Sequence, residues 1–310
     1  MALGRFVSPQ ARVEYDAAYD RGFAALPEPT GQHDIATEFG TARVYRFGEP
    51  GPTPVMLLPG RAGTSVMWEP NLAAFVARGP VWTVDLIGEP GRSEQTAPIR
   101  GAADQAAWLG TVLDTLEPCP VHLVGYSFGG WLATNLAVRA PRRLASVTLI
   151  DPVQTFARFP LDLLVRSALT LIPGIRRWAR PSFLRWISGS AEVKADDPVA
   201  TVIDEGMRNF RIALPTPTAF TDAQLRSLTV PVLTLIAGRS VMHDARRAVA
   251  RARDLLPDVR AELWPSATHA IAGEAATEVN ARVLEFLAEI EQRGGKTGAC
   301  RCPWRPGPRG

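Results

Sequence analysis

Short apolar runs alternate with amphipathic segments along most of the chain. Six short segments rich in apolar residues predict strands, and the first of them is a continuous apolar run typical of a buried strand in a parallel sheet. They are residues 53–60, 80–88, 120–127, 145–151, 230–238 and 259–265. The segments that follow most of these runs have apolar residues at helical spacing and predict helices. They are residues 67–78, 103–116, 129–140, 244–256 and 276–292.

This order of elements predicts a mostly parallel sheet with helices on both faces. Residues 36–40 and 42–48 flank a Gly-Thr pair and predict an antiparallel hairpin ahead of the first run. The alternation stops after residue 151, where helical pieces interrupted by prolines follow without a clear strand. An insertion at this edge of the sheet, where ligands bind in such folds, indicates a helical cap.

The chain therefore divides into a core and three additional segments. We expect an N-terminal lead-in at 1–33, an α/β core at 34–151 and 230–292, a helical cap at 152–229, and a tail at 293–310.

Composition fits one large hydrophobic core, since 46% of the 310 residues are hydrophobic and 21% are charged. The formal net charge of +3 is concentrated at the C-terminal end. The last 18 residues carry five basic side chains and no acidic one, so the rest of the chain is slightly acidic. The charge therefore gives no reason to expect a nucleic-acid partner. The tail is rich in glycine and proline without periodicity, which predicts disorder.

The three cysteines, Cys119, Cys300 and Cys302, have no spacing typical of a disulfide framework. This pattern predicts a protein without a disulfide scaffold in a reducing compartment, the cytoplasm. The C-x-C pair in the tail lacks further metal ligands, so we expect no metal site. The first residues lack the apolar segment of a signal peptide, and no apolar run reaches the roughly 18 residues of a membrane span.

One chemical motif, Gly125-Tyr126-Ser127-Phe128-Gly129, joins a predicted strand to a predicted helix. Glycines at both ends leave room for a tight turn that would hold Ser127 at its apex with an exposed hydroxyl. The N-terminal end of the helix and the backbone N–H of Phe128 would favour developing negative charge there. A simple N-cap serine is the alternative. A dinucleotide loop is disfavoured, because G-x-G-x-x-G is not matched.

This segment resembles the nucleophile elbow of the α/β-hydrolase superfamily, and the resemblance covers about residues 34–292. Residues 57–68 resemble the family's oxyanion segment, with Pro59 where the family usually has histidine. The resemblance therefore carries over only a backbone role, which falls on the N–H of Arg61. Residues 84–94 resemble the family's D-x-x-G-x-G-x-S turn, with Glu-Pro before the second glycine. The family fold implies a mostly parallel eight-stranded sheet with a cap after the sixth strand.

A serine nucleophile needs a general base, and the chain has four histidines. His33 is in the lead-in, and His122 lies within the strand before the serine motif. The resemblance favours His269 as the base, because the family's catalytic histidine lies in the loop between the last strand and the last helix. The order of nucleophile first and histidine last also fits. His243, in the loop after residue 238, is the alternative.

Two aspartates are candidates for the acid that orients the base. The family's commonest position, here near Val241, has no acidic residue. Its other position, directly after the strand that follows the nucleophile helix, is occupied by Asp151. Pro152 favours an extended backbone at Asp151, which helps to aim the carboxylate. Asp244 is the alternative acid, although it is equally well placed to cap a helix. We favour Asp151.

These residues predict a serine hydrolase that cleaves an ester, thioester or lactone bond of a small apolar substrate through an acyl-enzyme. No cofactor or metal is implied. The alternative is a non-catalytic member of the fold that binds a small ligand or a protein, an interpretation that Pro59 and the missing acid near Val241 favour. Basic and apolar residues interleave at 158–185, which predicts amphipathic cap helices over the pocket, with a membrane-surface lid as the alternative.

Overall fold

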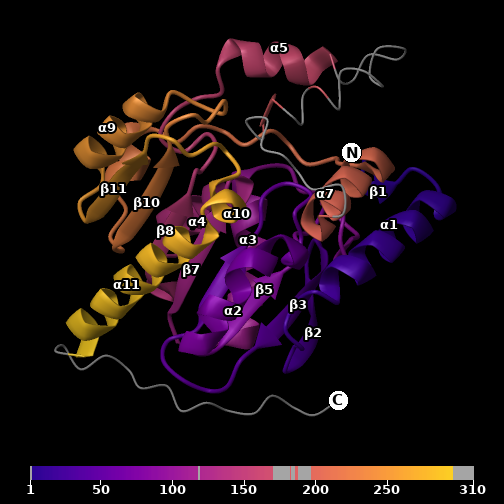
Figure 1. The fold of residues 1–310 in the computed structure, drawn as a ribbon, viewed down its shortest axis with the longest axis horizontal. Coiled ribbons are helices and arrows are strands. Elements are labelled where there is room, and N and C mark those ends of the chain that lie inside the picture. Colours follow the sequence, from indigo (N-terminus) through magenta and orange to yellow (C-terminus); the bar gives the residue numbers. More distant parts are fainter. Residues whose placement is uncertain (1, 118, 170–181, 183–185, 188–196, 296–310) are drawn as a thin grey trace.

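The structure, a computed structural model, describes residues 2–117, 119–169, 182, 186–187 and 197–295. Its centre is a sheet with helices on both faces (Figure 1). The strands, in chain order, are β1 Arg5–Phe6, β2 Gly31–Thr37, β3 Gly40–Phe47, β4 Val55–Leu58, β5 Val81–Val84, β6 Glu94–Gln95, β7 Val121–Tyr126, β8 Leu144–Ile150, β9 Phe210–Arg211, β10 Val232–Ala237 and β11 Val259–Trp264.

Helices occupy the segments between these strands, together with two short 3₁₀ turns at Ser65–Trp68 and Pro141–Arg143. The helices are α1 Pro9–Phe23, α2 Glu69–Arg78, α3 Ala102–Leu116, α4 Phe128–Arg139, α5 Leu161–Leu169, α7 Pro198–Asn209, α8 Asp222–Arg226, α9 Ala245–Leu255, α10 Ile271–Glu274 and α11 Ala276–Gly295.

The sheet is mostly parallel, as the sequence predicts. Its strand order is β11-β10-β8-β7-β4-β5-β3-β2, and β6 pairs additionally with β3. Neighbours from β11 to β5 are parallel, whereas β3 runs antiparallel to both β5 and β2. The sheet therefore has nine strands, eight along this path and the two-residue β6 beside β3. Because β4, β7, β8 and β10 are parallel, their carboxyl ends meet at one edge.

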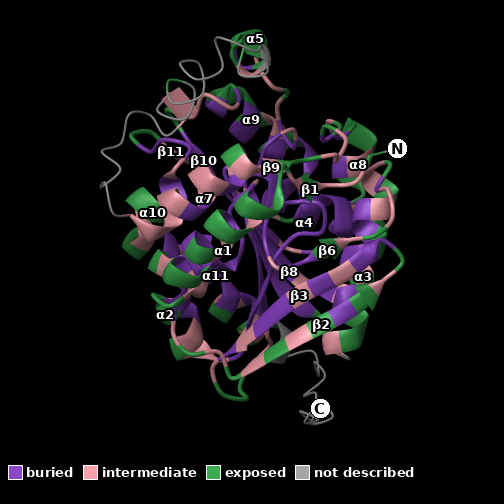
Figure 2. Ribbon diagram, turned by 90° about the vertical axis from the view of Figure 1, so that its right-hand side faces the viewer, coloured by how far each residue is buried: buried purple, intermediate pink, exposed green. Residues whose placement is uncertain are grey.

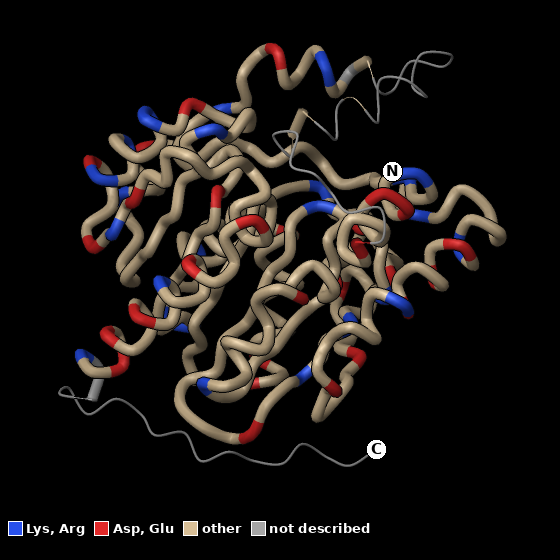
Figure 3. Tube along the Cα trace, in the orientation of Figure 1, with Lys and Arg blue, Asp and Glu red and all other residues tan. Residues whose placement is uncertain are grey.

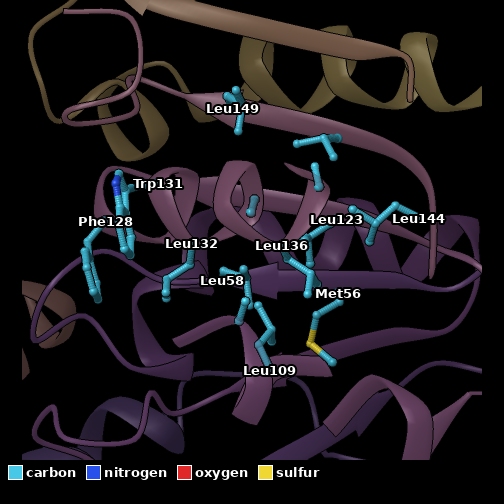
Figure 4. Close-up of a cluster of buried hydrophobic side chains, with 14 of the residues drawn as sticks. Met56, Leu58, Leu109, Leu123, Phe128, Trp131, Leu132, Leu136, Leu144 and Leu149 are labelled. Atoms are coloured by element: carbon cyan, nitrogen blue, oxygen red, sulfur yellow. The ribbon is translucent and has the colours of Figure 1, made fainter. Parts of the chain in front are cut away.

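Side chains of the central strands alternate between two hydrophobic cores, one on each face of the sheet. Met56 and Leu58 of β4 pack towards α3 and α4, as Figure 4 shows. Val55 and Leu57 belong to the core shared with α2 and α11. Each fully buried aliphatic side chain contributes about 1.5–3 kcal/mol. Figure 2 shows the result, with the central strands buried and exposed residues on the edge strand β2 and on the helices.

The N-terminal segment is more structured than a lead-in, and it contacts the predicted cap. Tyr15 and Tyr19 of α1 pack with Val202 of α7 in a small buried cluster. The strand β1 pairs antiparallel with β9, so that Phe6 lies opposite Phe210. The expectation that residues 152–229 contain no strand is therefore wrong. A two-residue strand leaves no periodic pattern in the sequence, because its pairing depends on a distant partner.

The described part of the insertion between β8 and β10 contains α5, α7 and α8, and Figure 1 shows α5 at the outer edge of the molecule. Most of the basic segment at 158–185 lies outside the described residues. The expected tail from residue 293 begins later in the structure, because α11 continues to Gly295. Residues 296–310 lie outside the described range. None of the described helices is long and apolar enough to cross a membrane.

Two observations on charge and cysteine complete the fold. Acidic and basic residues intersperse over the described chain (Figure 3), in keeping with the small net charge. Cys119 is disulfide-bonded, contrary to the expectation drawn from the cysteine count. The three cysteines of the sequence have no framework spacing from which a bridge could be inferred.

Candidate active site

The turn between β7 and α4 holds Ser127 in a backbone conformation that few non-glycine residues adopt. Its φ is 52° and its ψ is −112°, a strain that costs about 1–3 kcal/mol and persists only where the surroundings enforce it. The Ser127 N–H donates to the Ile150 carbonyl of β8 at 3.0 Å. The strained turn therefore fixes the serine at the carboxyl edge of the sheet.

Close backbone approaches explain the two glycines of the motif. A Cβ added at Gly125 would lie 2.3 Å from the carbonyl oxygen of Gly129, and one at Gly129 would lie 2.1 Å from the carbonyl oxygen of Leu58. Neither distance is compatible with a side chain. The N-terminal end of α4 therefore rests directly on the end of β4, where the segment resembling an oxyanion loop begins.

The structure brings His269 to Ser127. His269 Nε2 lies 3.0 Å from Ser127 Oγ, although the two residues are 142 positions apart in the chain. The Tyr126 hydroxyl donates to the His269 carbonyl at 2.6 Å, and the two rings stack at 5.2 Å between centroids. The hydroxyl of Thr268 donates to the Glu274 carboxylate at 2.7 Å. These contacts hold the loop between β11 and α10 against the serine turn.

Asp151, rather than Asp244, lies against His269. Its Oδ2 is 2.6 Å from His269 Nδ1, and its carboxylate is fully buried. Asp244 instead caps α9, where its side chain accepts the Arg247 N–H at 3.0 Å. The expectation of an extended backbone at Asp151 is wrong, since its φ is 43°. The donors around the carboxylate determine how it is held.

Four groups surround the Asp151 carboxylate. Oδ2 also accepts the hydroxyl of Ser240 at 2.6 Å, and Oδ1 accepts the N–H of Ala237 at 3.0 Å. His243 Nε2 lies 3.0 Å from Oδ1 in a close but poorly aligned contact. Burial alone would raise the pKa of Asp151, but the two adjacent histidines, His243 and His269, outweigh it and hold that pKa well below its usual range. The carboxylate is therefore ionised at neutral pH.

Sequence reasoning missed several of these contacts. It treated His243 only as an alternative base, whereas the structure places it on the acid's other oxygen. It noted Ser240 only as part of a run without an acid. Only the position of the two residues in the fold could have indicated this contact. Both follow β10, which lies beside β8 in the sheet, and Asp151 directly follows the last residue of β8. His122 is buried in β7, as its position in a strand predicts. Its Nδ1 lies 2.7 Å from Ser146 Oγ.

Two backbone N–H groups near the serine have no acceptor among the described residues. Phe128 is the first residue of α4, so its N–H has no partner within the helix. No acceptor is found within the described chain for the N–H of Arg61 either. The loop of Arg61 lies beside the serine, since a Cβ at Gly60 would be 3.4 Å from Ser127 Cβ.

Buried aromatic side chains lie beside this turn. Phe128 stacks on Trp131 with ring centroids 5.7 Å apart and planes inclined by 7°. Trp131 contacts Phe220, and its indole N–H donates to the Thr218 carbonyl at 2.8 Å. Within the described residues, no group of three His, Cys, Asp or Glu side chains is arranged to hold a metal ion. A serine hydrogen-bonded to histidine, and the histidine to a buried carboxylate, suits nucleophilic chemistry at a carbonyl.

Comparison with known proteins agrees with this fold. Residues 55–282 match the alpha/beta hydrolase family. The carboxylesterase YbfK of Bacillus subtilis is 31% identical over 291 residues, which cover 91% of this chain and 96% of that protein. Its crystal structure has a TM-score of 0.81 at 30% identity and covers 90% of this chain and 98% of that one. The crystal structure of naproxen esterase from Bacillus subtilis has a TM-score of 0.80 at 29% identity, with 91% and 100% covered.

The mostly parallel sheet, the strained serine turn and the histidine loop after the last strand define a protein of the α/β-hydrolase class. The chain belongs to the alpha/beta hydrolase family.

The close approach at Gly129 generates a stability prediction. Gly129→Ala places a methyl group against the Leu58 carbonyl, so the free energy of unfolding should fall by about 2–3 kcal/mol. Gly110→Ala in α3 is the matched control, because a Cβ there meets no atom within 4 Å. It should raise stability by roughly 0.5–1 kcal/mol through helix propensity. Urea unfolding measures both, and equal effects at the two glycines would contradict the steric account.

The contact between His243 and Asp151 predicts a second effect on stability. His243→Leu removes a polar group from the buried carboxylate and should lower the free energy of unfolding at neutral pH by about 1–3 kcal/mol. His243→Gln should lose less, because the glutamine side-chain N–H can donate to the same oxygen. Urea titration of the two variants is the measurement. If leucine is tolerated as well as glutamine, Asp151 does not depend on His243.

Proposed function

We propose that this α/β hydrolase is a serine esterase that cleaves a carboxylic ester of a small apolar substrate through an acyl-enzyme intermediate. The observation that carries the proposal is the continuous series Ser127 Oγ, His269 Nε2, His269 Nδ1 and Asp151 Oδ2, with successive contacts of 3.0 and 2.6 Å. Likeness to two carboxylesterases over nearly the whole chain supports ester bonds as the target.

In the acylation step, Ser127 Oγ attacks the carbonyl carbon of the ester as its proton moves to His269 Nε2. The carbonyl oxygen becomes an oxyanion, which the N–H groups of Phe128 and Arg61 would receive. Each such donor lowers the barrier by roughly 3–4 kcal/mol. The tetrahedral intermediate then expels the alcohol, whose oxygen takes the proton from His269, and the acyl group stays on Ser127.

Deacylation repeats these transfers with water. Water attacks the acyl carbon and gives a proton to His269, which passes it to Ser127 Oγ as the carboxylic acid leaves. Asp151 stays ionised throughout. It holds the imidazole in the tautomer with a hydrogen on Nδ1 and stabilises the imidazolium that forms in both steps. The low pKa of Asp151 supports this role, because a carboxyl that kept its own proton would stabilise neither form.

The aromatic residues beside Ser127 support an apolar substrate. Phe128 stacks on Trp131, and Trp131 contacts Phe220 in a tilted arrangement, next to the nucleophile turn. Aromatic side chains bind apolar groups through buried area and offer no counter-charge to an anionic group. We therefore expect aryl and alkyl esters to be better substrates than esters of strongly charged acids.

A direct test of the nucleophile uses a fluorophosphonate probe and a short p-nitrophenyl ester. The wild type should be labelled and active, whereas Ser127→Ala should lose labelling and about 10⁶-fold in kcat. Mass spectrometry of the labelled peptide identifies the modified residue. An intact, folded wild type that neither labels nor hydrolyses any ester of a broad panel would favour the non-catalytic binding module instead.

The choice between the two aspartates is tested by a matched pair of amide variants. Asp151→Asn should lower kcat by about 10⁴-fold, because the amide no longer fixes the histidine tautomer. Asp244→Asn should leave kcat within about twofold, since asparagine caps a helix as well as aspartate. Steady-state kinetics on one ester decides between them. The opposite ranking would transfer the acid role to Asp244.

A further inference from the structure

We propose that the buried Glu89 is a positioning residue for the oxyanion-binding loop and acts through the side chain of Arg61. The loop comprises residues 59–64, between β4 and the following 3₁₀ turn. This inference rests on the proposed function, because it assigns a supporting residue to the oxyanion donors of that reaction.

The oxyanion-binding loop needs external support. Two of its non-glycine residues have positive φ values, 56° at Ala62 and 51° at Thr64. Such conformations are individually unfavourable and persist only where the surrounding contacts enforce them. The loop must also hold the N–H of Arg61 in a fixed direction, since an oxyanion donor works only when it is aimed in advance.

Glu89 contacts the loop at two consecutive residues. Its Oε1 accepts a hydrogen bond from Arg61 Nη1 at 2.7 Å, and its Oε2 accepts the backbone N–H of Ala62 at 3.2 Å. The Glu89 side chain is only 2% exposed. One carboxylate thus fixes both the side chain of Arg61 and the peptide that follows it. The N–H of Arg61 lies in the peptide directly before these two fixed points.

Arg61 extends the same connection to the second oxyanion donor. Its guanidinium carbon lies 4.4 Å from the centroid of the Phe128 ring. Phe128 carries the other unpartnered N–H, at the start of α4. An aromatic face attracts a cation placed over it, and a planar guanidinium stacks on such a face readily. Glu89, Arg61 and Phe128 therefore form a clamp that links the two donors, which come from loops about 67 positions apart in the chain.

The charges of the clamp argue against Arg61 as a receptor for an anionic substrate. Its guanidinium is already neutralised by a carboxylate at hydrogen-bond distance. Burial raises the pKa of Glu89, and the adjacent Arg61 and the Ala62 N–H counteract this by lowering it. The carboxylate therefore depends on Arg61 for its own ionisation, and a substrate anion would have to compete for that cation.

The loop that carries Glu89 is itself held firmly. Gly88 has a φ of 84°, and a Cβ at that position would lie 2.7 Å from the side chain of Leu214. A Cβ at Gly206 of α7 would lie 2.8 Å from Pro90. Asp85, in the same turn, accepts both the N–H and the hydroxyl of Ser65 at 2.9 Å. The turn after β5 thus supports the oxyanion-binding loop near both of its ends.

The test is a double-mutant cycle on kcat and KM with a short p-nitrophenyl ester. Glu89→Ala and Arg61→Met should each lower kcat about 30- to 100-fold and leave KM within about threefold, the pattern of an interaction needed in the transition state. The kcat of the double variant should be no lower than that of the less active single variant, because both side chains act through one unit. Glu89→Gln should recover part of the loss, since its carbonyl still accepts a hydrogen bond.

Two controls separate this role from a general loss of stability. Glu291→Gln removes the arginine–carboxylate pair with Arg78, at the opposite edge of the sheet, and should leave kcat within about twofold. Affinity for a trifluoromethyl ketone, whose serine adduct carries an oxyanion, should fall in parallel with kcat in the Glu89 variants.

Different outcomes overturn different statements. Unchanged kcat in both Glu89 variants, or single losses that multiply in the double variant, would refute the clamp. A rise in KM at constant kcat would make Arg61 a substrate-binding residue instead. Full activity in Ser127→Ala would refute the proposed function and the clamp with it. If Glu89→Ala does not fold, Glu89→Gln with wild-type kcat and wild-type inhibitor affinity still refutes the clamp.

Discussion

The contact of α4 with the end of β4 is the constraint on which the rest of the site depends. At Gly129 the helix backbone comes so close to the Leu58 carbonyl that no side chain fits between them. This approach joins two features that a serine hydrolase needs within a few ångströms, the turn of Ser127 and the loop of Arg61. It also explains why the turn is strained, because a relaxed connection between β7 and α4 would move the helix away from β4.

Buried carboxylates then fix the loops at the carboxyl edge of the sheet. Asp151, Glu89 and Asp85 are each removed from water and each surrounded by donors from another segment. A buried charge is costly when it is unpaired, so each carboxylate strongly selects the arrangement that satisfies it. Asp151 stabilises the position of the loop after β11, which carries His269. Glu89 and Asp85 stabilise the position of the loop after β4. Rigid strands and ionic contacts thus hold segments that have no regular structure of their own.

The sequence predicted the parallel sheet, because apolar runs and helical spacing are local signals that survive without knowledge of partners. It also predicted that Ser127 and His269 would meet, since the elbow motif and the last loop of the fold have fixed positions. It could not choose with certainty between Asp151 and Asp244, because both follow strands that end at the same edge. The roles of His243 and Glu89 were still harder to predict from the sequence. Their importance depends on which oxygen or which loop they touch, and residue spacing carries no such information.

The pairing of β1 with β9 and the packing of α1 on α7 connect the first residues of the chain to the insertion that follows β8. The insertion is therefore attached to the core through its two chain connections and also through a third point near the N-terminus. A hinge at the two connections alone would be insufficient to swing α7 outwards. Substrate entry that required such a swing would have to displace α1 as well.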